Sequence, residues 1–167
     1  TVKTLYNPEN GRILGAQIVG FDGVDKRIDV LATAIRAGMT GEDLEELDLA
    51  YAPPYSSAKD PVNMAGFVIG NIRSGLLKQF NWEDLEELQK QRGEGKITLL
   101  DTRTEREYAQ GHFQGSVNIP LDELRERLSE LDPQKPVYVN CHSGLRSYLA
   151  CRILTGNGFE CYNFSGG

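Results

Sequence analysis

The second half of the chain alternates short apolar strands with helices, and this pattern constrains the fold more than any other feature. We predict strands over residues 97–100, 116–119, 137–140 and 160–164, with helices over 104–110, 121–131 and 147–157 between them. Strands this short and apolar are typical of a parallel sheet covered on both faces. Another helix, capped by Asn81 and ended by Gly93, comes before them. The sequence therefore predicts an α/β domain over residues 80–167.

The first half has a different pattern. Apolar runs at 2–5 and 13–19 flank the turn sequence 7–11, which predicts a hairpin. Three helices should follow, capped by Asp22, Thr40 and Asp60, and Gly38 should end the first of them. The paired prolines in residues 51–55 exclude a helix or a central strand there. We expect a smaller α+β domain over residues 1–73, with the domain boundary in residues 73–81.

Charge and composition exclude several classes of protein. The net charge is −6 and both halves are acidic, so nucleic acid and anionic membranes are not expected partners. No apolar run approaches the length of a membrane span, and the first residues do not have the pattern expected of a signal peptide. The three cysteines are an odd number without metal-ligand spacing, so we expect neither a disulfide framework nor a metal site. A reducing cytoplasm is the expected location.

The chemistry of the chain centres on Cys141, at the predicted junction of a strand, a loop and a helix. Ligands of open α/β sheets bind beyond the carboxyl ends of the strands. Gly144 permits unusual backbone angles, so the N–H groups of the loop can turn inward around an anion. These groups, the start of the helix and the Arg146 guanidinium all favour a thiolate. The loop residues expected to contact a substrate are His142, Ser143, Gly144, Leu145 and Ser147.

Alternative interpretations of Cys141 are weaker. A lone cysteine at a strand end is usually a small buried apolar residue, but the spacing of Gly144 and Arg146 favours a nucleophile. Cysteine phosphatases cradle a tetrahedral phosphate with a Cys-x5-Arg loop. This chain has Cys-x4-Arg, which is one residue shorter and suits the terminal sulfur of a persulfide. A phosphatase or arsenate reductase of the same fold is therefore the less favoured enzyme.

For the other polar and sulfur-bearing residues we prefer structural roles. Asp101 and Arg103 could line the rim of the site, but an internal ion pair is the preferred interpretation. His112 is expected to be a packed histidine and His142 to point outward. The remaining residues of this kind are expected in the core or in a turn and helix cap; they are Cys151, Cys161, Lys59 and Asp60.

Residues 82–167 resemble a rhodanese domain. The motifs are Leu100-Asp-Thr-Arg103, Glu107-Tyr108, Gly111-His-Phe113, Asn118-Ile-Pro120, Cys141-x-x-Gly-x-Arg-Ser147 and Tyr162-Asn-Phe-x-Gly-Gly167. The resemblance implies that Cys141 accepts a sulfane sulfur from a donor and passes it to a nucleophilic acceptor. The family pattern normally continues past the double glycine, and the chain opens with Thr1 rather than Met, so we expect it to be cut at both ends.

Residues 1–72 resemble the C-terminal dimerisation domain of flavin-dependent pyridine nucleotide-disulfide oxidoreductases, in the coenzyme A-disulfide reductase branch. The motifs are Gly11–Gly20, Asp25–Asp29, Leu49-Ala-Tyr-Ala-Pro-Pro-Tyr-Ser56 and Lys59-Asp-Pro-x-Asn-Met64. The resemblance implies a homodimer in which Tyr51 reaches the partner's flavin site; packing against the proline turn is the alternative. It also implies FAD, NAD(P)H and coenzyme A in a longer protein. This chain has no glycine-rich dinucleotide fingerprint and no flavin-facing redox cysteine, so no cofactor is expected in it.

Two hypotheses follow. In the first, Cys141 and Arg146 carry sulfur transfer from thiosulfate, a persulfide or coenzyme A persulfide, within a flavoprotein that reduces coenzyme A disulfide, persulfide or polysulfide. In the second, the chain is a non-catalytic dimerisation and docking fragment with an inactive rhodanese domain. Intact Cys141 and Arg146 favour the first hypothesis.

Overall fold

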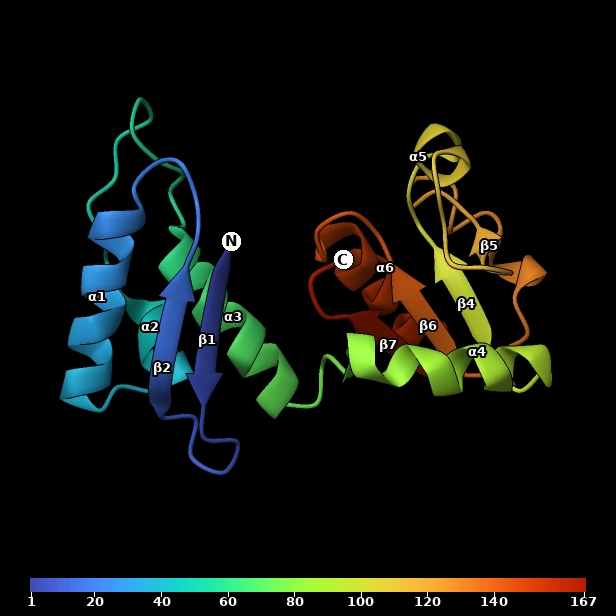
Figure 1. Cartoon of the computed structure of the whole chain (residues 1–167), viewed down its shortest axis with the longest axis horizontal. Helices are drawn as coiled ribbons and strands as arrows, with labels where there is room; N and C mark the ends of the chain where they lie inside the picture. Colours follow the sequence, from blue (N-terminus) through green and yellow to red (C-terminus); the bar gives the residue numbers. More distant parts are fainter. The chain divides into compact units, whose positions relative to one another are not determined.

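A computed structural model describes all 167 residues and divides the chain into two compact units, Thr1–Leu76 and Leu77–Gly167 (Figure 1). The first unit is drawn in blue to green and the second in lime to red. None of the helices is both long and apolar enough to cross a membrane.

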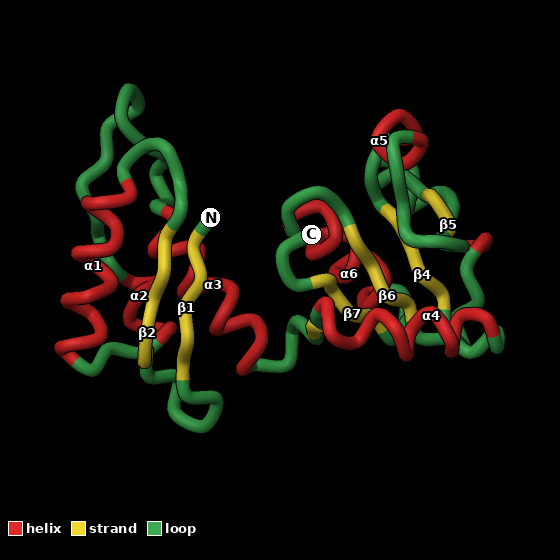
Figure 2. The backbone as a smooth tube through the Cα atoms, in the orientation of Figure 1, coloured by secondary structure: helices red, strands yellow, loops and turns green.

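The first unit is an antiparallel hairpin packed on three helices. The hairpin pairs β1 (Val2–Tyr6) with β2 (Ile13–Ile18), as predicted. The helices are α1 (Val24–Ala37), α2 (Gly41–Glu46) and α3 (Pro61–Arg73), joined by loops that Figure 2 shows in green. The core of the unit comes from β2 and all three helices and contains Ile13, Leu31, Leu44, Val62 and Ile69.

The caps of these helices confirm two of the three predicted starts. The Thr40 hydroxyl accepts a bond from the Asp43 N–H, and the Asp60 carboxylate accepts one from the Val62 N–H at 3.0 Å. The prediction for Asp22 was wrong. Helix α1 begins after Gly23, whose φ of 62° turns the chain into the helix without a side-chain cap.

The second unit is built on a five-stranded parallel sheet with strand order β3-β7-β6-β4-β5, which confirms the predicted fold class. The strands are β3 (Gln79–Phe80), β4 (Thr98–Asp101), β5 (Val117–Asn118), β6 (Val137–Asn140) and β7 (Cys161–Phe164). Strand β3 was not predicted, because two residues are too few to show a periodicity. It lies within the stretch expected to separate the domains and pairs with β7 at the sheet edge.

Helices cover both faces of this sheet. Val137 and Val139 pack in one cluster with the buried side of α6 (Leu145–Gly156). Tyr138, between them, packs on the opposite face in a cluster with Leu88 of α4 (Leu85–Gly93). The short helix α5 (Glu105–Ala109) follows β4, and Thr104 and Glu107 form a capping box at its start. Alternate residues of β6 therefore serve opposite faces, as a buried parallel strand requires.

The helix predicted over residues 121–131 is wrong. The chain forms successive turns there, and only Leu128–Glu130 is helical, as a 3-10 turn. Most of its hydrogen bonds join a carbonyl to the N–H three residues later, as from Leu121 to Leu124. Leucines spaced by three and four residues suit such turns as well as an α-helix. Leu124 and Leu131 are still buried in the core, so the pattern indicated burial correctly and helix type incorrectly.

Candidate active site

Cys141 lies at the carboxyl edge of the sheet, directly after the central strand β6. The loop that follows β4 is bonded to the end of β6, because both the N–H and the hydroxyl of Thr102 donate to the Asn140 carbonyl at 3.1 Å. Two strand ends are thus joined beside the cysteine. This is the edge at which open α/β sheets bind ligands.

The sulfur of Cys141 is buried, with 5% of the residue exposed, and faces hydrogen-bond donors. The Gly144 N–H lies 3.1 Å from Sγ and the Ser147 hydroxyl 3.2 Å from it. Gly144 has a φ of 93°, a conformation that side chains disfavour. This turn brings the loop back over the sulfur just before α6 begins at Leu145.

These donors determine the acidity of Cys141. Burial is the largest single effect and raises its pKa. Hydrogen bonds from the Ser147 hydroxyl and from the N–H groups of Ser147, Ser143 and Gly144 oppose it, and together they hold the pKa below that of an ordinary thiol. These hydrogen bonds therefore shift Cys141 toward the thiolate, which is the nucleophilic form of cysteine.

The side chains of the loop are arranged in two ways. His142, Ser143 and Leu145 have exposed side chains, and of these three residues Ser143 bonds the cysteine sulfur through its N–H. Ser147 is fully buried and shares its hydroxyl between Cys141 Sγ and the Gly144 carbonyl, each at 3.2 Å. The part of Ser147 as a donor to the sulfur was not predicted from sequence.

Arg146 makes a bidentate ion pair with Glu107. Its two terminal nitrogens each lie 2.7 Å from one carboxylate oxygen of Glu107. Glu107 also accepts bonds from the N–H and hydroxyl of Thr104, and these four contacts hold its pKa well below the usual range, Arg146 contributing most. In the sequence Glu107 appears only within the Glu107-Tyr108 motif, with no ion-pair partner assigned to it. The pair joins residues 39 positions apart, so no local pattern reveals it.

Asp101 and Arg103 form the ion pair preferred from sequence. The Arg103 guanidinium donates to both Asp101 oxygens at 2.6–3.0 Å and to the Gly111 carbonyl at 2.7 Å. Asp101 is completely buried. The amide of Asn118 donates to the main-chain carbonyls of Asp101 and Arg103, which joins the end of β5 to the loop after β4.

The other candidates lie in structural positions. Cys151 and Cys161 are buried, and their sulfurs are 2.8 Å apart; the contact with Cys151 and burial both raise the pKa of Cys161. His112 stacks on the Tyr108 ring with centroids 3.7 Å apart, and its Nδ1 lies 2.9 Å from the Tyr108 carbonyl. Neither the two core thiols nor His112 is arranged as a second nucleophile or base for Cys141.

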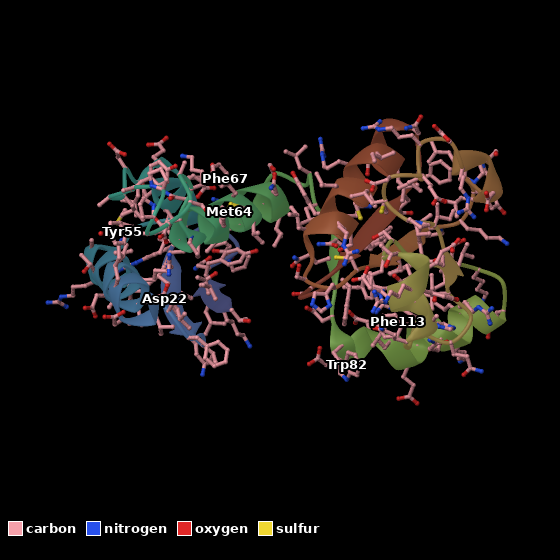
Figure 3. All side chains as sticks on the ribbon, turned by 90° about the horizontal axis from the view of Figure 1, so that it is seen from above. Asp22, Tyr55, Met64, Phe67, Trp82 and Phe113 are labelled. Atoms are coloured by element: carbon pink, nitrogen blue, oxygen red, sulfur yellow. The ribbon has the colours of Figure 1, made fainter.

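In the first unit, the predicted site residue Tyr51 is exposed in the loop before α3. The nearby Lys59 ammonium lies 5.5 Å from the centre of the Phe67 ring, which Figure 3 labels. Asp60 is buried as a helix cap and pairs with Arg27 at 3.1 Å. Lys59 and Asp60 therefore have the structural roles expected of them.

The turn from β6 into α6 does not fit a dinucleotide. The turn from β6 into α6 contains one glycine, Gly144, and the sulfur of Cys141 occupies the donors at that helix start. A dinucleotide site would need a glycine-rich turn there, open to a pyrophosphate.

Comparisons with protein families match both units. The family described as a rhodanese-like domain matches residues 84–167, and the pyridine nucleotide-disulphide oxidoreductase dimerisation domain matches residues 1–61. An uncharacterized protein of Bacillus subtilis, YqhL, is 38% identical over 104 residues, which are 62% of this chain and 82% of YqhL. Coenzyme A disulfide reductase of Staphylococcus aureus is 48% identical over 66 residues, 40% of this chain and 15% of the reductase.

Two solved structures resemble nearly the whole chain. Reduced CoADR-RHD of Bacillus anthracis is 47% identical with a TM-score of 0.92, and a NAD-dependent persulfide reductase from A. fulgidus is 43% identical with a TM-score of 0.83. Each covers 99% of this chain, which spans only 29% of each of them. The predicted combination of a dimerisation domain with a rhodanese domain is confirmed.

Proposed function

Because this chain belongs to the rhodanese-like domain family, with a pyridine nucleotide-disulphide oxidoreductase dimerisation domain before it, we propose that Cys141 carries a transferable sulfur atom. The observation that supports the proposal best is the position of its sulfur, 3.1 Å from the Gly144 N–H and 3.2 Å from the Ser147 hydroxyl. These donors favour a thiolate and also suit the negative charge of a persulfide.

In the first step, the Cys141 thiolate attacks the outer sulfur of a sulfane donor. The bond between that sulfur and the rest of the donor breaks, and the leaving group departs with the electron pair, as sulfite from thiosulfate or a thiolate from a persulfide. In the second step, an acceptor thiolate attacks the outer sulfur of the Cys141 persulfide. The Cys141 thiolate then leaves, and its charge is again stabilised by the loop donors.

The loop residues 142–145 and Ser147 supply the surroundings of the persulfide. The N–H groups of Ser143, Gly144 and Ser147 bond the sulfur, and the exposed His142 and Leu145 side chains form the outer surface of the loop. Arg146, five residues after Cys141, would add a full positive charge near the anion.

We further propose that this chain is part of a flavoprotein that reduces coenzyme A disulfide, persulfide or polysulfide in the cytoplasm. FAD, NAD(P)H and coenzyme A would be bound by segments outside this chain. Homodimerisation would use the first unit, which exposes many large apolar side chains, among them Tyr55 and Met64 in Figure 3. The others are Leu5, Leu14, Val19, Phe21, Tyr51, Val68 and Leu76. Tyr51 would reach the partner's flavin site from this surface.

The test is intact mass after incubation with a low concentration of thiosulfate. We expect one added sulfur atom, which peptide mapping assigns to Cys141 and which a thiol acceptor removes. Cys141→Ser should gain none, whereas Cys151→Ala, the matched loss of a buried thiol, should still gain one. A folded chain that takes no sulfur from any sulfane donor would support the alternative of a non-catalytic docking domain.

A further inference from the structure

The guanidinium nearest to Cys141 along the chain is already occupied by a carboxylate. Arg146 binds Glu107 through two contacts of 2.7 Å, and Thr104 donates to the same carboxylate at 2.8 Å and 3.0 Å. About a third of each side chain in the pair is exposed, 32% for Arg146 and 31% for Glu107. The pair is therefore fixed in position but still accessible to a ligand that approaches the loop.

A second compensated pair lies close to it. Arg103 donates to both oxygens of Asp101, and it is close enough to Arg146 for the two positive charges to repel one another. Thr102, between Asp101 and Arg103, is bonded to the end of β6 beside Cys141. The edge of the sheet at the sulfur thus carries two arginines and two carboxylates whose formal charges cancel.

We infer that Glu107 determines the charge of the donor that Cys141 accepts, by holding Arg146 in a bidentate ion pair that favours singly charged sulfane-sulfur donors over doubly charged ones. This inference rests on the proposed sulfur transfer. A donor with one negative charge can approach Cys141 without displacing Glu107 from Arg146. A donor with two has to compete with Glu107 for Arg146 and is repelled by its carboxylate.

A comparison of two sulfane-sulfur donors can distinguish the effect of donor charge from the effect of donor reactivity. Thiosulfate and methanethiosulfonate each carry a sulfane sulfur on an oxidised sulfur atom, but thiosulfate has two negative charges and methanethiosulfonate has one. The Cys141 thiolate takes the outer sulfur from either. Sulfite leaves from the first and methanesulfinate from the second, each with the electron pair of the broken bond. The ratio of the two loading rates, compared between variants, cancels the difference in intrinsic reactivity.

Glu107→Gln removes the charge while keeping a side-chain oxygen for the capping box, in which Glu and Gln are both effective. Thr104→Ala is the matched control, because it removes the hydroxyl cap and leaves the Glu107 charge in place. Glu107→Ala is a second neutral variant, which covers the case in which the Gln variant does not fold. Thermal melting of each variant establishes that it is folded at the assay temperature.

We expect Glu107→Gln to raise the rate of loading by thiosulfate relative to methanethiosulfonate by about threefold to tenfold at low ionic strength. The gain should shrink as salt screens the exposed charges. Thr104→Ala should leave the ratio within about twofold of the original. An unchanged ratio in the folded neutral variants, with Cys141 still loaded by both donors, would overturn the role of Glu107 alone. Failure of both donors to load the unmodified chain would overturn the proposed function itself.

Discussion

Removing the Ser147 hydroxyl should weaken the nucleophile without touching the cysteine. Ser147 is fully buried and its Oγ is 3.2 Å from Cys141 Sγ. A hydrogen bond to a charged group contributes about 1.5–3 kcal/mol. The low end applies here, because the single hydroxyl proton also has the Gly144 carbonyl within 3.2 Å and stabilises one acceptor at a time. Ser147→Ala should therefore disfavour the thiolate by about 1.5 kcal/mol, which is a roughly tenfold smaller thiolate fraction.

The reaction rate of Cys141 should fall by less than its thiolate fraction. A thiolate of higher pKa is intrinsically more nucleophilic, with a Brønsted coefficient of about 0.4–0.5, so a tenfold loss of thiolate is offset by about threefold. The net effect on alkylation by iodoacetamide, below the pH at which the thiol ionises, should be roughly threefold to fourfold slower reaction. The midpoint of the pH–rate profile should move upward, because the donor that lowered the pKa is gone.

The assay is stopped-flow or mass-resolved alkylation of Cys141 across pH, with folding confirmed by thermal melting. Ser143→Ala is the matched control. Its side chain is exposed in the same loop and its backbone N–H remains, so its profile should coincide with that of the unmodified chain. If Ser147→Ala leaves the midpoint and the rate unchanged, the backbone N–H groups alone set the acidity of Cys141, and our account of the hydroxyl is wrong.

Four more outcomes are expected. Arg146→Ala should slow sulfur loading of Cys141 by roughly tenfold to a hundredfold. Arg146→Lys should slow it less, because lysine keeps the charge without the planar guanidinium. A loading rate for Arg146→Ala within about twofold of the unmodified chain would show that Arg146 is not a site residue. The partners of Glu107 depress its pKa, so the ionised carboxylate stabilises the folded chain fully above the ordinary carboxyl pKa of 4.5, and this stabilisation is lost as pH falls. Thermal melts in acid should therefore show a smaller loss of stability for Glu107→Gln than for the unmodified chain. Leu154→Ala, at a fully buried position, should lower the free energy of unfolding in urea by about 2–5 kcal/mol. Light scattering should find a homodimer through the first unit, and a clean monomer at high concentration would count against that interface.

The fold could be predicted from sequence wherever a local pattern determines it. The strand–loop–helix around Cys141 and the capping boxes of Thr40 and Thr104 depend on neighbouring residues, and the structure contains them. Residues 121–131 were misassigned because their leucine spacing is compatible with two kinds of turn. Strand β3 was missed because its two residues are too few to show a periodicity, and its partner β7 lies about eighty residues further along the chain.

The site was less predictable than the fold. The cysteine and its loop have a spacing that can be read locally, whereas the partner of Arg146 is on another helix. The same holds for the direction of the Ser147 hydroxyl, which depends on how the first turn of α6 meets the end of β6. Sequence thus located the candidate nucleophile Cys141, whereas only the three-dimensional contacts show which groups surround its sulfur.

The two buried thiols in the core of the second unit can also report how often that unit opens. Cys151 and Cys161 lie on α6 and β7 and are 3% and 6% exposed, so a thiol reagent can modify them only when helix and sheet separate. In a Cys141→Ser background, their rate of modification at low reagent concentration reports the equilibrium population of that opened state. The same measurement can be repeated in variants that also carry one of the substitutions discussed above. A faster modification of Cys151 and Cys161 would show, without denaturant, that a change in the loop of residues 141–147 also loosens the sheet.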